Sequence, residues 1–369
     1  MKEYKITIFT PTYNRGYLLR NLYESIKNNK KLQNECKKSL LFKEKTSDSS
    51  NSNAKMDSLN DKQIDYLSEF EWLIVDDGST DNTKELVEEF IKENEINIRY
   101  IYKENGGKHT AINVGVKEAK GELFFIVDSD DLILQGAINF IVEYWNSIKK
   151  GEKLISRDSK CAAVDCINNK KVIDRVKLDS NSDKFGYNGI VGACVNSKGE
   201  RTGTLISEEK GPLPFSDIYY KYNAKGDRAI AWVTDVLKKY PFPEREGIKF
   251  LPESVVWHEM SKKYKVFISN VPLTQIEYRN DGLTKNVFKK TLLKGRAFEY
   301  LNLLNNGTYP LDRYPYMWIK NYINLARYSL LSESSFFCEI DGLFKKFLYI
   351  LMFPFGYFKY TKQKDQVKD

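Results

Sequence analysis

The chain has 369 residues, of which 41% are hydrophobic and 29% are charged, and its formal net charge is +8. This composition indicates a globular protein, and the chain is long enough for one large α/β domain and an appended piece. The basic residues are dispersed among acidic ones instead of forming a stripe along one element, which argues against a nucleic-acid-binding protein.

The number and spacing of the cysteines bear on whether the chain has a zinc site or disulfide bonds. They are odd in number and lack paired C-x-x-C spacing, so neither a zinc site nor a disulfide framework is expected. The five are Cys36, Cys161, Cys166, Cys194 and Cys338. A predicted strand begins almost at the N-terminus and leaves no room for a secretory signal, so we expect a cytoplasmic protein with free thiols.

Two β-loop-α units are predicted first. Residues 4–10 alternate polar and apolar side chains, break at Pro-Thr-Tyr-Asn-Arg-Gly, and continue with apolar residues at helical spacing. Residues 71–75 form a second apolar run, which enters the sequence Asp-Asp-Gly-Ser-Thr-Asp at 76–81 and then another helical pattern. Each unit therefore delivers a polar loop to the end of a strand.

Two further strands follow the same design. Residues 97–102 are predicted to form a strand that leads into Asn-Gly-Gly-Lys-His at 105–109 and a helix. The apolar run 123–127 is typical of a central strand in a parallel sheet, and it ends in Asp-Ser-Asp-Asp at 128–131. In open α/β sheets, ligands bind at this carboxyl edge.

The acidic cluster at 128–131 has two interpretations. Three carboxylates within four residues repel one another unless a cation joins them, and hard oxygen ligands without a neighbouring cysteine or histidine favour Mg²⁺ or Mn²⁺ over zinc. The alternative is a solvated acidic turn, with Asp130 or Asp131 capping the following helix. This motif alone leaves both interpretations open.

Taken together, the four motifs resemble the family 2 glycosyltransferases. The resemblance is carried by residues 10–15, 75–81, 105–108 with Ala111 and Asn113, and 127–131, in the order and spacing of the family. It implies the GT-A fold, an α/β, Rossmann-like domain with a mostly parallel central sheet flanked by helices. It also implies inverting transfer of a sugar from a nucleotide-diphosphate sugar, with UDP as our default, to a hydroxyl of a glycan or lipid-linked acceptor.

The resemblance further implies roles for individual residues. Asp130 would bind the Mn²⁺ or Mg²⁺ ion directly, Asp128 would bind it through water or hold the ribose, and Asp77 would accept a hydrogen bond from the base or ribose. The other donor-binding candidates are Thr10, Pro11 and Tyr13 around the nucleobase, Gly107 and Lys108 near the diphosphate or base, and Ser129. The ordinary alternative for the Asp77 motif is a turn before a helix.

In the second half of the chain, the resemblance implies that Glu253 acts as the general base. Residues 249–253 lead into a helix that begins at Glu253, where the helix dipole favours an ionised carboxylate. The family usually has a Glu-Asp pair here, whereas this chain has Glu253 followed by Ser254. The alternative is a glutamate that only stabilises the first helical turn. His258 could bind the metal ion, or it could pack beside Trp257.

We expect the transferase domain to occupy residues 1–260. Within it, residues 28–68 contain a Ser/Asn/Asp tract and are predicted to form a mobile surface loop. The irregular region 149–214 would form the acceptor side, as the resemblance implies. Residues 261–369 are predicted to form a helical C-terminal extension.

Residues 343–360 form an aromatic-rich apolar segment between lysines. The segment is shorter than the roughly 20 apolar residues that span a bilayer, and it contains Pro354 and Gly356. We expect an amphipathic segment in peripheral contact with an anionic membrane, and the alternative is a helix docked on the catalytic domain. Membrane contact would fit a lipid-linked acceptor used for a bacterial surface polysaccharide at the inner face of the cell membrane.

Two other functions compete with glycosyl transfer. A sugar-phosphate nucleotidylyltransferase has the same fold class, but it carries a glycine-rich basic loop after the first strand, where this chain has Pro-Thr-Tyr-Asn-Arg at 11–15. A non-catalytic membrane-associated scaffold would keep the fold without turnover. The acidic cluster and Glu253 argue against that scaffold.

Overall fold

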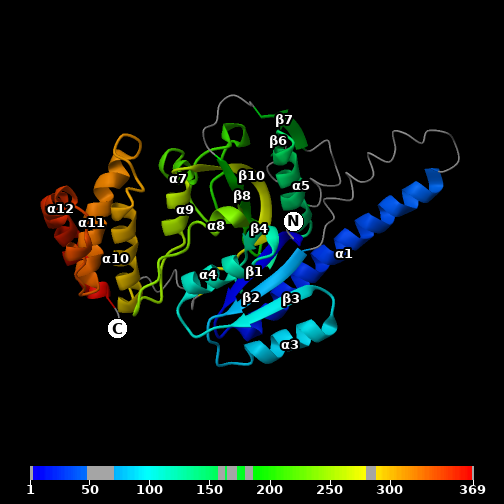
Figure 1. Ribbon diagram of the computed structural model, residues 1–369, viewed down its shortest axis with the longest axis horizontal. Helices are drawn as coiled ribbons and strands as arrows, with labels where there is room; N and C mark the ends of the chain where they lie inside the picture. Colours follow the sequence, from blue (N-terminus) through cyan, green and yellow to red (C-terminus); the bar gives the residue numbers. More distant parts are fainter. Residues whose placement is uncertain are drawn as a thin grey trace.

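One eight-stranded mixed sheet organises the molecule (Figure 1). The computed structural model describes residues 3–47, 70–156, 163, 173–178, 186–279 and 288–367, without the side chains of 36–47 and 291. The strand order is β3-β2-β1-β4-β9-β8-β10-β5. The strands are β1 (Tyr4–Thr12), β2 (Phe70–Asp76), β3 (Asn97–Tyr102), β4 (Gly121–Ile126), β5 (Leu132–Ile133), β8 (Gly186–Val195), β9 (Arg228–Val233) and β10 (Tyr264–Gln275). A separate antiparallel pair consists of β6 (Glu152–Ser156) and β7 (Ile173–Lys177).

The four strands predicted from the sequence are confirmed and form the parallel part of the sheet. β1 pairs with β2 and β4, and β2 pairs with β3. In this register Thr12 lies beside Asp76, and Phe9 lies beside Ile126. Because parallel strands end at the same edge, the polar segments that follow them gather there.

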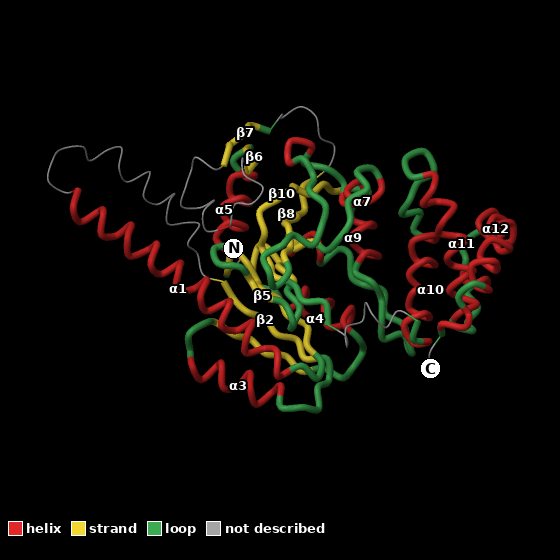
Figure 2. The backbone as a smooth tube through the Cα atoms, turned by 180° about the vertical axis from the view of Figure 1, so that it is seen from behind, coloured by secondary structure: helices red, strands yellow, loops and turns green. Residues whose placement is uncertain are grey.

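Helices cover both faces of the sheet (Figure 2). Ile6 and Ile8 of β1 belong to a buried cluster with α1, α3 and α5, whereas Phe9 belongs to a second cluster with α4 and α9. This alternation along β1 is the period of two that a strand buried on both faces requires. The helices of this part are α1 (Gly16–Ser47), α3 (Thr83–Glu93), α4 (Lys108–Glu118), α5 (Ala137–Lys149), α7 (Phe215–Tyr220), α8 (Thr234–Leu237) and α9 (Ser254–Met260).

The structure corrects the surface loop predicted at 28–68. The first part of this segment continues helix α1 as far as Ser47, and the part from residue 48 lies outside the described residues. Gln33 supplies one reason, because it is 1% exposed and its Nε2 donates a hydrogen bond to Asn139 Oδ1 at 2.7 Å. The lysines, leucines and glutamates of this stretch are also good helix formers.

The domain boundary predicted at residue 260 is wrong, because β10 belongs to the main sheet. β10 pairs in parallel with β8 and antiparallel with β5, and Phe267 and Leu273 on it are fully buried. The α/β domain therefore extends at least to Gln275. The region 149–214 is also more regular than expected, since it contains β8, a ten-residue strand inside the sheet.

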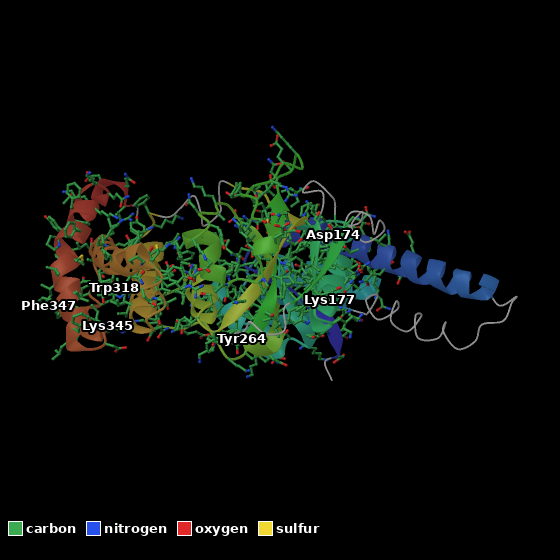
Figure 3. All side chains as sticks on the ribbon, turned by 90° about the horizontal axis from the view of Figure 1, so that it is seen from above. Asp174, Lys177, Tyr264, Trp318, Lys345 and Phe347 are labelled. Atoms are coloured by element: carbon green, nitrogen blue, oxygen red, sulfur yellow. The ribbon has the colours of Figure 1, made fainter. Side chains whose placement is uncertain are left out.

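The helical C-terminal extension is present, but it begins later than predicted. It consists of α10 (Lys290–Asn305), α11 (Pro315–Leu331) and α12 (Leu343–Thr361). α10 faces the α/β domain, and α12 lies on the outer side (Figures 1 and 3). Short 3-10 turns occur at Glu208–Lys210, Phe337–Glu339 and Lys364–Gln366. Within the described residues, no helix is both long enough and apolar enough to cross a membrane.

Candidate active site

A cavity of about 1260 Å³ opens at the carboxyl edge of the parallel strands. The loops after β1, β2 and β4 form part of its wall, and residues 249–253, which we call the strap, form another part. Ten of the predicted site residues line it: Pro11, Tyr13, Asp77, Gly107, Lys108, Asp128, Ser129, Asp130, Glu253 and His258. The fold therefore brings segments that are far apart in the sequence into one site.

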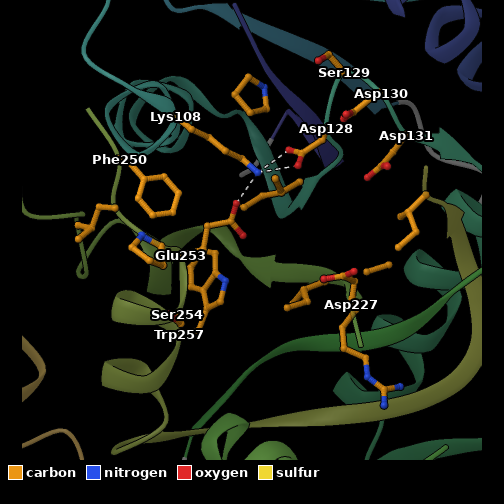
Figure 4. Close-up of a pocket in the computed structure, with 18 of the residues that line it drawn as sticks. Lys108, Asp128, Ser129, Asp130, Asp131, Asp227, Phe250, Glu253, Ser254 and Trp257 are labelled. Atoms are coloured by element: carbon orange, nitrogen blue, oxygen red, sulfur yellow. Dashed lines mark hydrogen bonds and ion pairs between the residues drawn. The ribbon is translucent and has the colours of Figure 1, made fainter. Parts of the chain in front are cut away.

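Lys108 joins Asp128 to Glu253 (Figure 4). Its Nζ lies 2.7 Å from each oxygen of Asp128 and 2.7 Å from Glu253 Oε1. Burial acts to lower the pKa of Lys108, but the charges of Asp128 and Glu253 outweigh burial, and the pKa is raised above its ordinary value. One ammonium group thus holds the predicted base and a strand-end carboxylate together.

Glu253 stands at the N-cap of α9, as predicted, yet its side chain makes no capping hydrogen bond. The carboxylate turns instead toward Lys108 and the cavity (Figure 4). α9 has only seven residues, so its dipole is a weaker influence on Glu253 than the direct contact with Lys108. This geometry argues against a glutamate that only stabilises the first helical turn.

Asp130 and Asp131 have different surroundings. Asp130 Oδ2 lies 2.6 Å from Arg15 Nη1, and both side chains are largely buried. Burial, together with the charges of Asp128 and Asp130, raises the pKa of Asp131 to about 9. At neutral pH Asp131 is therefore protonated, and a cationic side chain faces each of the other two carboxyl groups of this loop.

The oxygen ligands of this loop suit a hard divalent cation, but they do not converge on one point. Within the described ranges, no group of three or more His, Cys, Asp and Glu side chains is arranged to hold a metal ion. Asp128 faces Lys108, and Asp130 faces Arg15. A metal ion at Asp128 and Asp130 would require both carboxylates to leave these partners, and metal dependence stays a prediction.

Asp77 positions the glycine-rich loop. Its carboxylate accepts hydrogen bonds from the backbone N–H groups of Gly106 at 2.9 Å and Gly107 at 2.7 Å, and from the side chains of Lys103 and Asn105. Both oxygens are used, and Asp77 is 4% exposed. The N–H groups expected to approach a diphosphate are therefore occupied, so the predicted contacts of Asp77 and Gly107 with a donor require this loop to rearrange.

Gly107 has a second role, which is to let the strap approach. Its φ is +99°, and a Cβ at this position would lie 2.0 Å from the carbonyl oxygen of Lys249. Only glycine combines this backbone conformation with such a contact. The glycine-rich loop therefore fixes one side of the strap that carries Glu253.

Thr10 is a correction to the predicted nucleobase wall. It is fully buried, and its Oγ1 accepts a hydrogen bond from Trp72 Nε1 at 3.0 Å, so its side chain belongs to the core. Thr12 is the threonine that lines the cavity, and its buried Oγ1 has no hydrogen-bond partner within the described structure. Pro11 and the half-exposed Tyr13 line the cavity, as expected.

His258 lies in a buried polar and aromatic cluster. Its Nδ1 is 2.9 Å from Ser216 Oγ, and its Nε2 is 3.3 Å from Tyr220 OH. Burial lowers the pKa of His258 to about 3, so the ring is neutral. These contacts support the packing role, because binding a metal ion would require one of the two hydrogen bonds to break.

Three cavity residues were not identified from the sequence as site residues. Arg15 belongs to the first loop motif, so its position at a strand end was the available signal. Asn14 adopts a left-handed conformation with φ of +52°, and its Oδ1 accepts a hydrogen bond from the N–H of Thr80, which ties the loops after β1 and β2 together. Trp232 on β9 lines the cavity with a buried Nε1 that has no partner among the described residues.

Part of the sequence that forms this site matches a known family. Residues 55–157 match the profile of glycosyl transferase family 2, a range that includes the motifs at 75–81, 105–108 and 127–131. This match confirms the predicted resemblance to the family 2 glycosyltransferases. The GT-A type of α/β fold expected for this domain is confirmed, with the helical extension attached to it.

Curated relatives match the glycosyltransferase domain over short segments. A teichoic acid poly(glycerol phosphate) polymerase of Staphylococcus epidermidis is 40% identical over 80 residues, which are 21% of this chain and 11% of the relative. The glycosyltransferase GlyG of Streptococcus pneumoniae is 40% identical over 74 residues, 20% of this chain and 24% of the relative. The chain thus matches a quarter or less of the length of these relatives.

Two further comparisons involve one protein of Staphylococcus aureus. The poly(ribitol-phosphate) beta-N-acetylglucosaminyltransferase TarS is 36% identical over 91 residues, 24% of this chain and 16% of that protein. The crystal structure of TarS residues 1–349 with UDP-GlcNAc aligns with a TM-score of 0.48 at 17% identity, over 94% of this chain and 79% of that one.

Proposed function

We propose that the protein is an inverting glycosyltransferase that moves a sugar from a nucleotide-diphosphate sugar to a hydroxyl of a glycan or lipid-linked saccharide. UDP is the favoured nucleotide. The observation that carries the proposal is the shared contact of Glu253 and Asp128 with Lys108. A candidate base and a strand-end carboxylate meet there in a cavity large enough for a nucleotide sugar.

Glu253 is the proposed general base. It would accept the proton of the acceptor hydroxyl while that oxygen attacks the anomeric carbon from the side opposite the diphosphate. One displacement of this kind inverts the anomeric centre and needs no covalent intermediate. The contact with Lys108 supports this role, because it holds the carboxylate toward the cavity.

The other charged residues would assist the leaving group. Departure of a nucleoside diphosphate develops negative charge, and Lys108 and Arg15 would face it once the donor displaces Asp128 and Asp130, while Lys108 keeps its contact with Glu253. A divalent cation held by Asp128 and Asp130 would neutralise further phosphate charge. Thr12 Oγ1 and Trp232 Nε1, which have no hydrogen-bond partner in the described part of the chain, are available to the donor or acceptor.

The acceptor is proposed to be a cell-surface polymer or its lipid-linked precursor. Two relatives carry names that refer to poly(glycerol phosphate) and poly(ribitol-phosphate) polymers, which supports this class of acceptor. A lipid-linked acceptor would be used at the cytoplasmic face of the cell membrane, and we propose that location for the enzyme.

The decisive experiment separates donor binding from transfer. Purified Glu253→Gln should keep the rise in melting temperature that a bound donor produces, but it should release nucleotide at least about 100-fold more slowly with donor and acceptor present. Glu246→Gln is the matched control, because Glu246 is exposed on the segment before the strap. Near wild-type turnover of Glu253→Gln at saturating donor would place the base elsewhere.

Measurements of donor binding and of the released products also distinguish the alternative functions. A thermal-shift panel of UDP-, GDP-, CDP- and TDP-sugars, with and without Mn²⁺, identifies the donor and tests metal dependence. A nucleotidylyltransferase would form pyrophosphate from a nucleoside triphosphate and a sugar phosphate instead of releasing a nucleoside diphosphate. A scaffold would bind a donor without any release.

A further inference from the structure

The outer face of α12 exposes a stripe of large apolar side chains. Eight such residues between Leu343 and Phe358 are more than half exposed. Five of them follow one another at intervals of three or four residues, so they share one side of the helix. They are Phe344, Phe347, Leu351, Phe355 and Phe358. Figure 3 shows Phe347 on the side of α12 that faces away from the rest of the molecule.

The opposite face of α12 is firmly packed. Tyr349 and Gly356 are its buried residues, and a Cβ on Gly356 would lie 2.6 Å from the Cβ of Ala326 on α11. This close approach fixes the rotation of α12 about its axis, so the apolar stripe points outward. Soluble proteins rarely leave a continuous apolar surface of this kind exposed unless it has a partner.

Basic residues accompany the stripe. Between Leu343 and Lys364 there are lysines at 345, 346, 359, 362 and 364, and the same stretch contains no aspartate or glutamate. Burial, and then the nearby charges of Arg327 and Lys320 on α11, lower the pKa of Lys359. The C-terminal end of α12, with Lys359, Lys362 and Lys364, therefore gathers positive charge beside exposed apolar side chains.

We infer that the outer face of α12 docks on an anionic lipid bilayer, with the helix in the plane of the interface. The apolar stripe would enter the boundary between headgroups and acyl chains, and Lys362 and Lys364 would meet lipid phosphates. A second copy of the chain is a poorer occupant, because pairing two such faces would bring their lysines together without a carboxylate from this stretch to balance them.

Docking would also orient the cavity relative to the membrane. α10 lies between α12 and the α/β domain, so the extension would hold the domain at a constant distance from the bilayer (Figure 1). This consequence rests on the proposed function, since it matters for an acceptor anchored in lipid. The docking itself does not depend on that function.

Co-sedimentation of the full chain with vesicles tests the inference. We expect binding to vesicles of phosphatidylcholine with phosphatidylglycerol and much weaker binding to phosphatidylcholine alone. Phe347→Gln with Leu351→Gln should weaken the binding at least about tenfold, and Lys362→Gln with Lys364→Gln should weaken it about fivefold per lysine on anionic vesicles. Ile91→Gln with Leu205→Gln removes two exposed apolar side chains elsewhere and should change nothing.

Two results would overturn the inference. One is equal binding of the wild type and the α12 apolar variant to anionic vesicles. The other is a dimer in sedimentation velocity without vesicles that the same two substitutions abolish, since α12 would then be a subunit interface. Circular dichroism verifies the fold of each variant. Measuring nucleotide release on the same samples tests membrane docking and enzyme activity separately. A protein that binds vesicles without releasing nucleotide would contradict the proposed activity but not the docking.

Discussion

Gly295 on α10 contacts the strap at Phe250 so closely that a Cβ at this glycine would lie 1.8 Å from the Phe250 carbonyl oxygen. On the other side of the strap, Gly107 makes the equivalent approach to Lys249. The strap that carries Glu253 is therefore held between the α/β domain and the helical extension. This arrangement gives α10 a direct influence on the candidate base.

Replacing Gly295 should slow transfer without preventing donor binding. In Gly295→Ala the new methyl group has to push the strap away from α10, because a helix backbone cannot yield by that distance. A displacement of about 1 Å at a catalytic group lowers a rate up to about 100-fold, so we expect a loss of kcat of about tenfold or more. Steady-state kinetics and donor thermal shift measure the two effects.

Lys294→Ala is the control for this substitution, because it changes the neighbouring position of α10 and keeps Gly295 against the strap. It should retain wild-type kcat. Unchanged kcat in Gly295→Ala, with a normal melting temperature, would mean that the position of the strap does not matter for catalysis.

Sequence alone predicts the strand-end motifs, because each follows a short apolar run and parallel strands end at one edge. It does not predict the pairing of Lys108 with Glu253, since nothing in the sequence at 249–253 signals which loop the strap crosses. The continuation of α1 through Gln33, where a loop was predicted, is not evident from the sequence for a similar reason. Its partner Asn139 lies 106 residues away, and a polar tract nearby makes the whole segment resemble a loop.

The β-strands of the second half are harder to predict for another reason. Arg228–Val233 contains small and apolar residues in a run too short to distinguish a strand from a helix, and only its pairing with β4 and β8 decides the matter. Trp232, which this strand delivers to the cavity, is missed with it. Thr10 illustrates the converse, because a motif residue can serve the core instead of the site.

Removing the charge of Lys108 should affect both stability and activity. Lys108→Met leaves Asp128 and Glu253 without their shared cation, and because these side chains are about a third exposed we expect the free energy of unfolding to fall by about 1–2 kcal/mol. Transfer should fall as well, since the carboxylate of Glu253 is no longer held toward the cavity. Urea denaturation and nucleotide release measure these losses.

A double variant tests whether the lost stability comes from this contact. Lys108→Met combined with Glu253→Gln should be more stable than the sum of the single effects predicts, because the second change removes an unpaired charge. Lys92→Met on the exposed side of α3 is the control and should leave stability and activity unchanged. If the changes in unfolding free energy of the two single variants simply add up in the double variant, Lys108 and Glu253 are not energetically coupled.

His258 should make folding stability depend on pH. Its folded pKa is lowered to about 3 by burial, whereas an unfolded histidine has a pKa of about 6.5. Between these values the unfolded state binds a proton that the folded state does not. The free energy of unfolding should therefore be highest above about pH 6.5 and fall as the pH drops, by at most about 1.4 kcal/mol per pH unit from this residue.

His258→Asn should flatten this pH dependence by up to one proton. Tyr220→Phe is the control, because it removes a hydrogen-bond partner of His258 and keeps the histidine. It should preserve the slope. Denaturation at several pH values between 5 and 8 measures it. A tenfold loss of Mn²⁺ affinity in His258→Asn, with no change in slope, would instead favour the metal-ligand role predicted from the sequence.

Arg15 should compete with a divalent cation for Asp130. The guanidinium occupies the carboxylate at 2.6 Å, so a metal ion that uses Asp130 has to displace it. Arg15→Ala removes the competitor and should raise the affinity for Mn²⁺ without nucleotide by about threefold to tenfold, whereas Asp130→Ala should abolish binding. Arg20→Ala is the control, because Arg20 pairs with Glu89 and Glu93 on the surface. If Arg15→Ala and the wild type bind Mn²⁺ with the same affinity, Arg15 does not compete with the ion, and Asp130 is not one of the metal ligands.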